Sequence, residues 1–327
     1  MRTVRLGSSG LEISGLVLGM MSYGDPGRGN HPWSVGLDEA RPFVRRAFEA
    51  GVTTFDTANV YSLGASEEIT GTLLAELGAR EDVQILTKVH GRMREGRNGA
   101  GLSRAAIMHE IDASLARLGT DYVDLYQIHR FDPNVEMEET MEALHDVVKA
   151  GKARYIGASS MWTWQFAELQ RVAEVNHWTR FVSMQDQYNL LDREEEREMH
   201  PFCRATGIGV LPWSPLARGR LTRPWGASGS GTRADTDEFG KTLYRAQEES
   251  NRAIVEAVAA VASERGVPMA QVALAWVAGR ETVSAPIVGA TKPHHIDDAV
   301  AALDLALTDD EVSRLEAAYT PRQPAGF

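Results

Sequence analysis

Short apolar runs alternate along this chain with longer stretches in which apolar residues recur every three or four positions. The short runs are rich in residues that favour β-strands, and the longer stretches have the spacing of amphipathic helices. We predict strands at Leu16–Leu18, Thr53–Asp56, Val83–Thr87, Tyr122–Ile128, Arg154–Ala158, Phe181–Gln185, Gly209–Pro212 and Val283–Ile287. We predict helices at Asp38–Ala50, Ser66–Leu77, Ser103–Leu118, Met137–Ala150, Trp164–Asn176, Glu194–Thr206 and Ala253–Arg265.

The residues at the ends of the predicted helices agree with these boundaries. Ser103 stands at the start of one helix, where its hydroxyl can cap the first turn. Several helices are followed by a glycine, which commonly ends a helix because it accepts left-handed backbone angles. These glycines are Gly51, Gly78, Gly119 and Gly151.

Alternating strands and helices predict parallel βαβ units. Roughly eight such units favour a closed TIM (β/α)8 barrel over an open sheet. Val4–Leu6 and Leu11–Ile13 are joined by Gly-Ser-Ser-Gly, so we predict an N-terminal β-hairpin that closes the bottom of the barrel. No change in composition marks a boundary, so residues 1–327 are expected to form a single domain. The longest irregular stretch is Arg218–Lys241, and loops of that length are usually functional or disordered.

Composition narrows the classes of partner. Hydrophobic residues make up 43% and the net charge is -11, which is typical of a globular protein and argues against binding to nucleic acid or to an anionic membrane. The one cysteine, Cys203, excludes an intrachain disulfide. We find no apolar stretch long enough for a signal peptide or a membrane span, so we expect a cytoplasmic protein. Formation of a homo-oligomer is left open.

Polar residues close several of the predicted strands. In a barrel, these strand ends face the active site. Asp56, Lys88, His129 and Gln185 occupy such positions, and Tyr61 follows Asp56 within Phe-Asp-Thr-Ala-Asn-Val-Tyr. Each residue alone has an ordinary structural explanation, such as a loop cap, a packed ring or a hydrogen-bonded polar group. Their shared position predicts an active site.

The chemistry of this set is that of a proton donor beside a positive charge. A phenol has an ordinary pKa of about 10, and a nearby ammonium lowers it by favouring phenolate. Asp56 would keep Lys88 charged and oriented, while His129 would bond a substrate carbonyl or relay the proton. A positive environment of this kind stabilises a forming alkoxide. Because no side chain supplies a hydride, a nicotinamide cofactor is expected.

Asp56, Tyr61, Lys88 and His129, in these strand contexts, resemble the catalytic tetrad of the aldo-keto reductase superfamily. The likeness covers nearly the whole chain and includes Gly-Lys-Ala-Arg-Tyr-Ile-Gly-Ala-Ser-Ser, Trp-Ser-Pro-Leu-Ala-Arg-Gly-Arg-Leu and Pro-Ile-Val-Gly-Ala-Thr-Lys-Pro. His-Arg-Phe-Asp-Pro and Gln-Tyr-Asn-Leu-Leu resemble a bacterial branch related to aryl-alcohol dehydrogenases and potassium-channel β subunits. The resemblance implies an NADPH-dependent reductase of aldehydes and ketones. Tyr61 would be its general acid, His129 its substrate orienter, and Lys88 with Asp56 the pair that tunes the acid.

Two segments are suited to the phosphates of a dinucleotide. The chain lacks a GxGxxG fingerprint, which argues against a Rossmann site, but barrels can bind phosphates near the loops after the last strands. One segment would use backbone N–H groups and arginines; it comprises Ser214, Pro215, Leu216, Ala217, Arg218, Gly219, Arg220 and Leu221. The other, Gly289–Lys292, follows the last strand and enters a helix, whose N-terminus attracts anions.

The resemblance implies further contacts with the cofactor. Ser159, Ser160 and Gln185 would hold the carboxamide, and Trp213 would stack on the nicotinamide ring. Thr291, Lys292 and His295 would lie at the adenosine phosphate, with Asp298 near the adenine. Lys292 implies a 2′-phosphate, and therefore NADP(H). Three positions depart from the family pattern: Ser160 replaces a common Asn, His295 a common Gln, and Ala299 a common Asn.

Loop position suggests the substrate pocket. Tyr23, Trp33, Val60 and Trp162, together with the Arg218–Lys241 loop, are candidates to line it, and aromatic walls suit aryl or aliphatic aldehydes and ketones. The tail Pro321–Phe327 is expected to cross the rim of the barrel. We predict no metal site, because His294 and His295 should point apart on their helix and no carboxylate has a suitable spacing.

Two other functions remain open from the sequence. One is a nicotinamide-binding regulatory or sensor protein with low turnover. The other is a barrel isomerase or lyase that uses Lys88 for a Schiff base.

Overall fold

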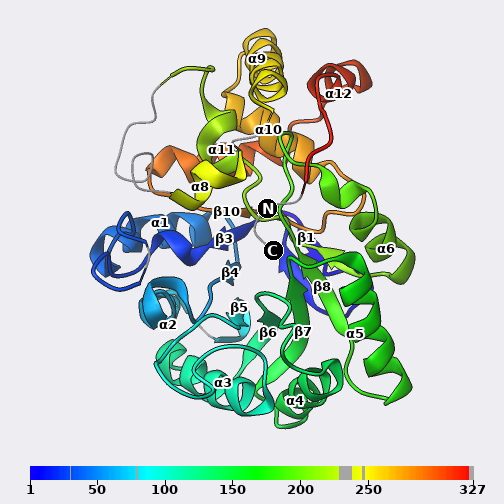
Figure 1. The fold of residues 1–327 in the computed structure, drawn as a ribbon. Helices are drawn as coiled ribbons and strands as arrows, with labels where there is room; N and C mark the ends of the chain where they lie inside the picture. The colour runs from blue at the N-terminus through cyan, green and yellow to red at the C-terminus, as the bar shows by residue number, and fades with distance from the viewer. Residues whose placement is uncertain (30, 79, 228–237, 245–246, 324–327) are drawn as a thin grey trace.

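A parallel sheet of eight strands forms the centre of the computed structural model, which describes residues 1–29, 31–78, 80–227, 238–244 and 247–323. The strands follow one another around the sheet in the order β10-β3-β4-β5-β6-β7-β8-β9. They are β3 (Val17–Gly19), β4 (Thr54–Asp56), β5 (Gln84–Val89), β6 (Val123–Ile128), β7 (Ala153–Ser159), β8 (Phe181–Gln185), β9 (Gly209–Val210) and β10 (Ile287–Val288). Figure 1 shows them around a common centre.

The two outer strands of this sheet meet and close it into a barrel. The backbone N–H of Ser284 donates to the carbonyl of Val210 at 2.9 Å, and that of Ile287 donates to Pro212 at the same distance. The predicted TIM (β/α)8 barrel is therefore confirmed. The last strand is shorter than predicted: Val283 makes only an isolated bridge to Val210, and the continuous ladder begins at Ile287.

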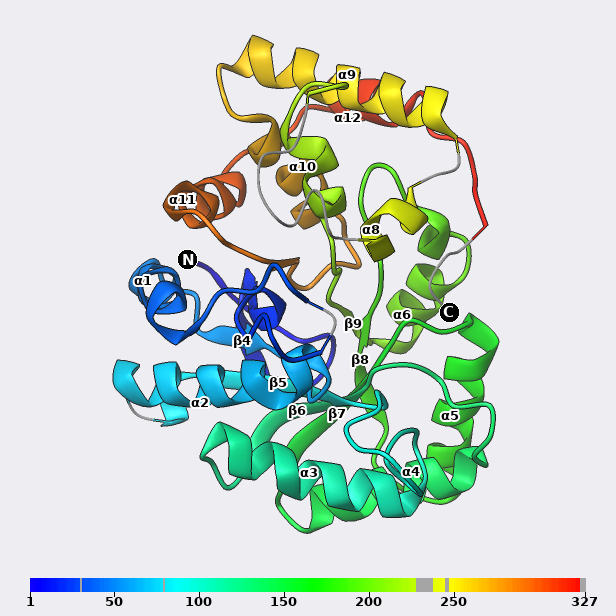
Figure 2. The same ribbon diagram turned by 60° about the vertical axis from the view of Figure 1, so that its left-hand side comes forward.

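Helices surround the barrel. They are α1 (Leu37–Glu49), α2 (Ala65–Leu77), α3 (Arg104–Leu118), α4 (Met137–Lys149), α5 (Thr163–Val175), α6 (Met199–Thr206), α8 (Glu238–Leu243), α9 (Glu248–Arg265), α10 (Met269–Ala278), α11 (Pro293–Ala302) and α12 (Asp309–Glu316). Short 3₁₀ helices lie between them at η1 (Met20–Ser22), η2 (Tyr61–Gly64), η3 (Arg80–Asp82), η4 (Glu194–Glu196) and η5 (Ala217–Thr222). Figure 2 shows α9 and α12 side by side, away from α3 and α4.

The ends of three helices test the predicted boundaries. The Ser103 hydroxyl accepts from the N–H of Ala106, and Gly119 ends the same helix with φ 64°, so both signals are confirmed. The predicted helix Glu194–Thr206 is wrong at its start: Glu194–Glu196 is a 3₁₀ turn, and α6 begins only at Met199. The Glu194 carboxylate instead accepts hydrogen bonds from the C-terminal segment. The helix predicted from Ala253 begins earlier, at Glu248, where acidic residues favour a helix N-terminus.

An N-terminal hairpin lies beneath the barrel, as predicted. β1 (Thr3–Arg5) pairs antiparallel with β2 (Glu12–Ser14), one residue away from the predicted bounds. Leu6 and Ile13 are buried in one apolar cluster with Leu86 and Leu125 of the barrel strands. The hairpin thus closes one end of the barrel and leaves the other end, where the strands terminate, for the site. In the described part of the chain, no helix has the length and apolar character needed to cross a bilayer.

Candidate active site

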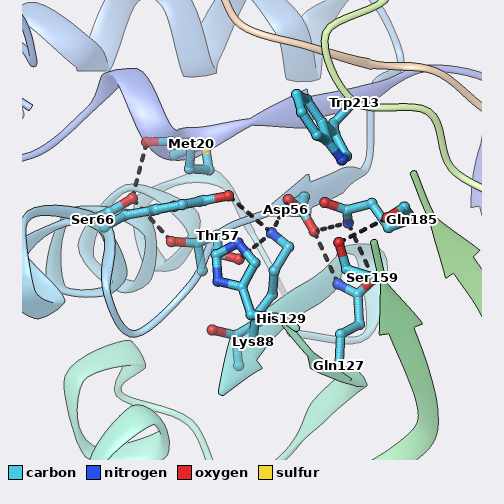
Figure 3. Close-up of polar contacts among 12 residues, drawn as sticks. Met20, Asp56, Thr57, Ser66, Lys88, Gln127, His129, Ser159, Gln185 and Trp213 are labelled. Carbon is cyan, nitrogen blue, oxygen red and sulfur yellow. Dashed lines mark hydrogen bonds and ion pairs between the residues drawn. The ribbon is translucent and has the colours of Figure 1, made fainter. Parts of the chain in front are cut away.

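Lys88 at the end of β5 lies at the centre of a group of polar contacts (Figure 3). Its ammonium donates to Asp56 Oδ1 at 2.5 Å, to the carbonyl of Thr57 at 2.8 Å and to Tyr61 Oη at 3.3 Å. The three contacts use the three donors of the group. Burial by itself lowers the pKa of Lys88, but the attraction and hydrogen bonds of Asp56 and Tyr61 outweigh it and raise the pKa above its ordinary value. Lys88 is therefore a fixed positive charge.

Asp56 is held from its other side by two amides. Its Oδ2 accepts from Gln185 Nε2 at 2.9 Å and from Gln127 Nε2 at 3.1 Å. Asp56 ends β4, whereas the amides come from β8 and β6. Because the side chain is only 3% exposed, these bonds and the Lys88 ion pair compensate for the loss of water around the carboxylate.

Of Asp56, Tyr61, Lys88 and His129, only Tyr61 and His129 are partly exposed to solvent. Both are half-buried, and their rings meet nearly at right angles with centroids 5.6 Å apart. The backbone N–H of His129 donates to the carbonyl of Val89, which fixes it beside the end of β5. Burial, followed by the charges of Lys88 and Arg130, holds the pKa of His129 well below 6.5. The imidazole is therefore neutral and has one N–H to donate.

A left-handed turn follows directly after Tyr61. Ser62 and Leu63 have φ of 47° and 46°, angles that cost energy for residues other than glycine. Ser62 is completely buried, and the Leu63 carbonyl accepts from Arg28 at 2.5 Å. Strain of this kind persists only where the surroundings impose it. The turn is a feature that the sequence pattern did not predict.

Ser159, Ser160, Gln185 and Trp213, the residues predicted at the nicotinamide, are brought together beside Asp56. The Ser159 hydroxyl donates to the Gln185 carbonyl at 2.7 Å, and Trp213 Nε1 donates to Ser160 Oγ at 3.1 Å. Figure 3 shows the Gln185 side chain pointing toward Asp56, with Trp213 to one side of them. The Gln185 amide thus binds Asp56 in this structure.

The segment predicted to bind pyrophosphate has an unusual backbone. Ser214, Ala217 and Arg218 all have positive φ, between 47° and 55°. Left-handed residues within a turn can direct successive N–H groups into a concavity that binds anions. Pro215, Leu216, Gly219 and Leu221 belong to the same turn. Of the longer Arg218–Lys241 stretch, residues 228–237 lie outside the described part of the chain.

The residues predicted at the adenosine phosphate surround the start of α11. Lys292 is the N-cap, Thr291 precedes it, and the Thr291 N–H donates to His295 Nδ1 at 3.2 Å. Asp298 accepts from Gln271 at 2.9 Å, so one of its oxygens is already engaged. Gly289 lies just after β10.

The expectation that His294 and His295 point apart is wrong. Their rings pack edge to face with centroids 4.7 Å apart, because the two side chains turn toward each other at the first turn of α11. Within the described ranges, no group of three or more His, Cys, Asp or Glu side chains is arranged to hold a metal ion.

The four residues predicted around a substrate fall in different places. Tyr23 is completely buried, stacks on Phe43 and donates to the carbonyl of Ala290 at 2.7 Å. It therefore packs in the core, and we do not include it among the proposed pocket residues. Trp33 is linked to Tyr61 through His31, whose ring centroid lies 5.0 Å from that of Trp33 and 6.0 Å from that of Tyr61. The remaining candidates lie nearer the surface: Val60 is half-buried and Trp162 is 46% exposed.

The C-terminal segment follows the rim of the barrel as far as it is described. Tyr319 Oη and the backbone N–H of Arg322 both donate to the Glu194 carboxylate, at 2.6 Å and 2.8 Å. This ties the segment to the loop after β8. Residues 324–327 of the predicted tail lie outside the described part of the chain.

Gln127 is the residue of this site that the sequence analysis missed. The available signal was an amide near the end of a largely apolar strand, two positions before His129. Because alternate residues of an extended chain face the same side, Gln127 in β6 and His129 directly after it are expected on one face.

Comparisons with known proteins agree with the geometry. The sequence model described as Aldo/keto reductase family matches residues 15–320. Versiconal hemiacetal acetate reductase of Aspergillus parasiticus is 46% identical to the chain and covers 98% of it, with 98% of that protein matched. A putative aryl-alcohol dehydrogenase of Saccharomyces cerevisiae is 41% identical with the same two coverages. These relatives are fungal, so the likeness is not confined to a bacterial branch.

Proposed function

The chain belongs to the aldo/keto reductase family, and we propose that it is an NADPH-dependent oxidoreductase that reduces aldehyde or ketone carbonyls to alcohols. The family and its relatives support an oxidoreductase of carbonyl compounds. The proposal adds the choice of NADP(H) and the role of Tyr61 as general acid. The observation that carries it is the contact of one buried ammonium, that of Lys88, with both Asp56 and Tyr61.

Tyr61 and its neighbours are suited to deliver a proton. A carbonyl oxygen gains negative charge during reduction, and it needs both a proton and positive surroundings. Tyr61 Oη gives the proton, and the Lys88 ammonium 3.3 Å away stabilises the phenolate that remains. The neutral His129 donates a hydrogen bond to the same carbonyl oxygen. When bound, the nicotinamide supplies the hydride to the carbonyl carbon.

The residues proposed for the cofactor form three groups, each for a different part of it. Ser159, Ser160, Gln185 and Trp213 receive the nicotinamide end. The left-handed turn that begins at Ser214 receives the pyrophosphate through its backbone N–H groups. Gly289, Thr291, Lys292, His295 and Asp298 receive the adenosine end. The Lys292 ammonium at the N-cap of α11 favours a 2′-phosphate, which is the reason for proposing NADP(H) over NAD(H).

The aromatic surroundings of Tyr61 favour apolar carbonyl substrates. Trp33, Val60 and Trp162 are the candidate walls, and aryl or aliphatic aldehydes and ketones fit such a lining. The relative from Saccharomyces cerevisiae, named as a putative aryl-alcohol dehydrogenase, agrees with an aryl substrate. We also propose that residues 1–327 act as one domain, since the family match covers 15–320 and the hairpin packs beneath the barrel.

The test is a panel of aryl and aliphatic aldehydes, with NADPH oxidation followed by stopped-flow absorbance. We expect multiple turnovers with at least one aldehyde, and slower turnover when NADH replaces NADPH. Binding of NADPH without turnover of any aldehyde would contradict the proposal and favour a sensor protein.

The surroundings of Lys88 disfavour the Schiff-base alternative. A lysine that attacks a carbonyl must be neutral and free to move. Lys88 is completely buried, and its raised pKa keeps it charged. Failure of borohydride to trap a substrate on Lys88 is therefore expected.

A further inference from the structure

Gln127 is a completely buried amide on β6 that has no role in the proton transfer described above. Its Nε2 donates to Asp56 Oδ2 at 3.1 Å, and its Oε1 accepts from Gln185 Nε2 at 3.1 Å. Gly157, its partner across the β6–β7 pair, leaves room for it, because an added Cβ there would lie 3.2 Å from Gln127 Cγ and 2.3 Å from Ser183 Oγ. The amide is thus enclosed by barrel strands and turned inward.

The chemistry of the three groups fixes which atom of each amide faces Asp56. A carboxylate only accepts hydrogen bonds, so the atoms of Gln127 and Gln185 next to Asp56 Oδ2 must be nitrogens. Gln127 then presents Oε1 to Gln185, and this oxygen also requires a nitrogen opposite it. The three bonds therefore form a closed ring in which only one orientation of each amide avoids an oxygen facing an oxygen.

This ring uses both hydrogens of the Gln185 amide. One goes to Asp56 Oδ2 at 2.9 Å and the other to Gln127 Oε1 at 3.1 Å. In the described part of the chain, Gln185 Oε1 accepts no hydrogen bond. It is also not one of the fully buried side-chain atoms that lack a hydrogen-bond partner. Gln185 can therefore offer a ligand an acceptor but not a donor.

We propose that Gln127 is a positioning residue that locks the Gln185 amide with Oε1 toward the cofactor, so that this oxygen accepts an N–H of the nicotinamide carboxamide. The inference rests on the proposed function. With Gln127 present, a half-turn of the Gln185 amide loses two hydrogen bonds, one to Asp56 and one to Gln127. Without Gln127, the same half-turn loses only the bond to Asp56. The nitrogen of Gln185, instead of its oxygen, would then face the cofactor in part of the molecules. The effect should be confined to the nicotinamide end.

The first test compares two ligands by isothermal titration calorimetry. NADP⁺ carries the nicotinamide, whereas 2′-phospho-ADP-ribose lacks it and keeps the phosphates. For Gln127→Met, a change of similar shape without the amide, we expect the dissociation constant of NADP⁺ to rise about tenfold, as for one lost hydrogen bond. The dissociation constant of 2′-phospho-ADP-ribose should stay within about twofold of wild type. Gln84→Met is the matched control, since Gln84 begins β5 at the opposite end of the barrel and bonds Thr53 and Thr54.

The second test uses Gln127→Glu, which keeps the shape of the side chain. A protonated Glu can donate to Asp56 and accept from Gln185, as the amide does, but an ionised Glu repels the Asp56 carboxylate. NADP⁺ affinity relative to wild type at the same pH should therefore be near normal at about pH 6 and fall toward that of Gln127→Met at about pH 9. If Gln127 had a purely structural role, 2′-phospho-ADP-ribose, which lacks the nicotinamide, would show the same dependence on pH as NADP⁺.

The outcomes separate this inference from the proposed function. If wild type binds neither ligand, the proposed function fails. If wild type binds both and Gln127→Met weakens both ligands equally or neither, the role of Gln127 is refuted. The same conclusion follows if the relative NADP⁺ affinity of Gln127→Glu does not change with pH, and this variant covers the case in which Gln127→Met does not fold.

Discussion

Replacing Asp56 by asparagine removes the only carboxylate that contacts Lys88 in the described part of the chain. The new side chain would direct its oxygen toward the donors of Gln127 and Gln185, which places its NH₂ group against the Lys88 ammonium. The ammonium would then be enclosed with a carbonyl and a phenol but without a counter-charge. Breaking a buried ion pair from one side typically costs about 3–5 kcal/mol. We expect a loss of about 4 kcal/mol in the free energy of unfolding.

The double variant Asp56→Asn with Lys88→Met separates the charge from the packing. Methionine fills the space of the Lys88 stem and tolerates the NH₂ group of the neighbouring asparagine. Because replacement of a complete buried pair is often nearly neutral, the double variant should be more stable than either single variant. Arg171→Met is a suitable control, since the Arg171–Glu168 pair lies on the surface and its loss should change little.

Urea and thermal unfolding, followed by tryptophan fluorescence, measure these differences. An unfolding entropy of about 2.1 cal/mol/K per residue gives about 0.7 kcal/mol/K for 327 residues. A loss of about 4 kcal/mol then lowers Tm by about 6 °C. If the costs of the two single changes simply add in the double variant, the pair is not a coupled charge and the reasoning is refuted.

Three further predictions concern single residues. Lys292→Ala should raise the dissociation constant of NADPH about tenfold and leave that of NADH nearly unchanged by fluorescence titration, because the ammonium attracts the extra phosphate; equal effects on both would contradict the assignment. Burial, with the charges of Asp186 and Glu195, raises the pKa of the Cys203 thiol, so a disulfide reagent should react with it only in urea; rapid reaction in buffer would disprove this. Burial, followed by Lys88, depresses the pKa of His129, so below about pH 6.5 the unfolded chain binds the extra proton and stability falls. His129→Gln should flatten the fall in urea-unfolding free energy toward about pH 5, and an unchanged slope would count against a neutral His129.

Local patterns in the sequence predict most of the fold because they depend on nearest neighbours. Apolar periodicity identifies the alternating strands and helices, and Ser103 and Gly119 mark real helix ends. The predicted start at Glu194 fails for a tertiary reason. That carboxylate is held by Tyr319 and Arg322, more than a hundred residues away.

The site was predictable in its members but not in its partners. A polar residue at the end of an apolar strand signals Asp56, Lys88 and His129. It does not show that Gln127 contacts Asp56 across 71 positions and Gln185 across 58, because these contacts depend on the closure of the barrel. In the same way, loop position placed Tyr23 near a substrate, whereas the fold encloses it in the core.

The most direct measurement is the comparison of wild type with Tyr61→Phe in single-turnover reduction of an aldehyde, together with the dissociation constant of NADPH. We expect the rate of the chemical step to fall by at least about a hundredfold, since general acid catalysis contributes about that much or more, while NADPH binds with unchanged affinity. A wild-type rate in the Phe variant would show that the Tyr61 hydroxyl does not supply the proton, and would contradict the account.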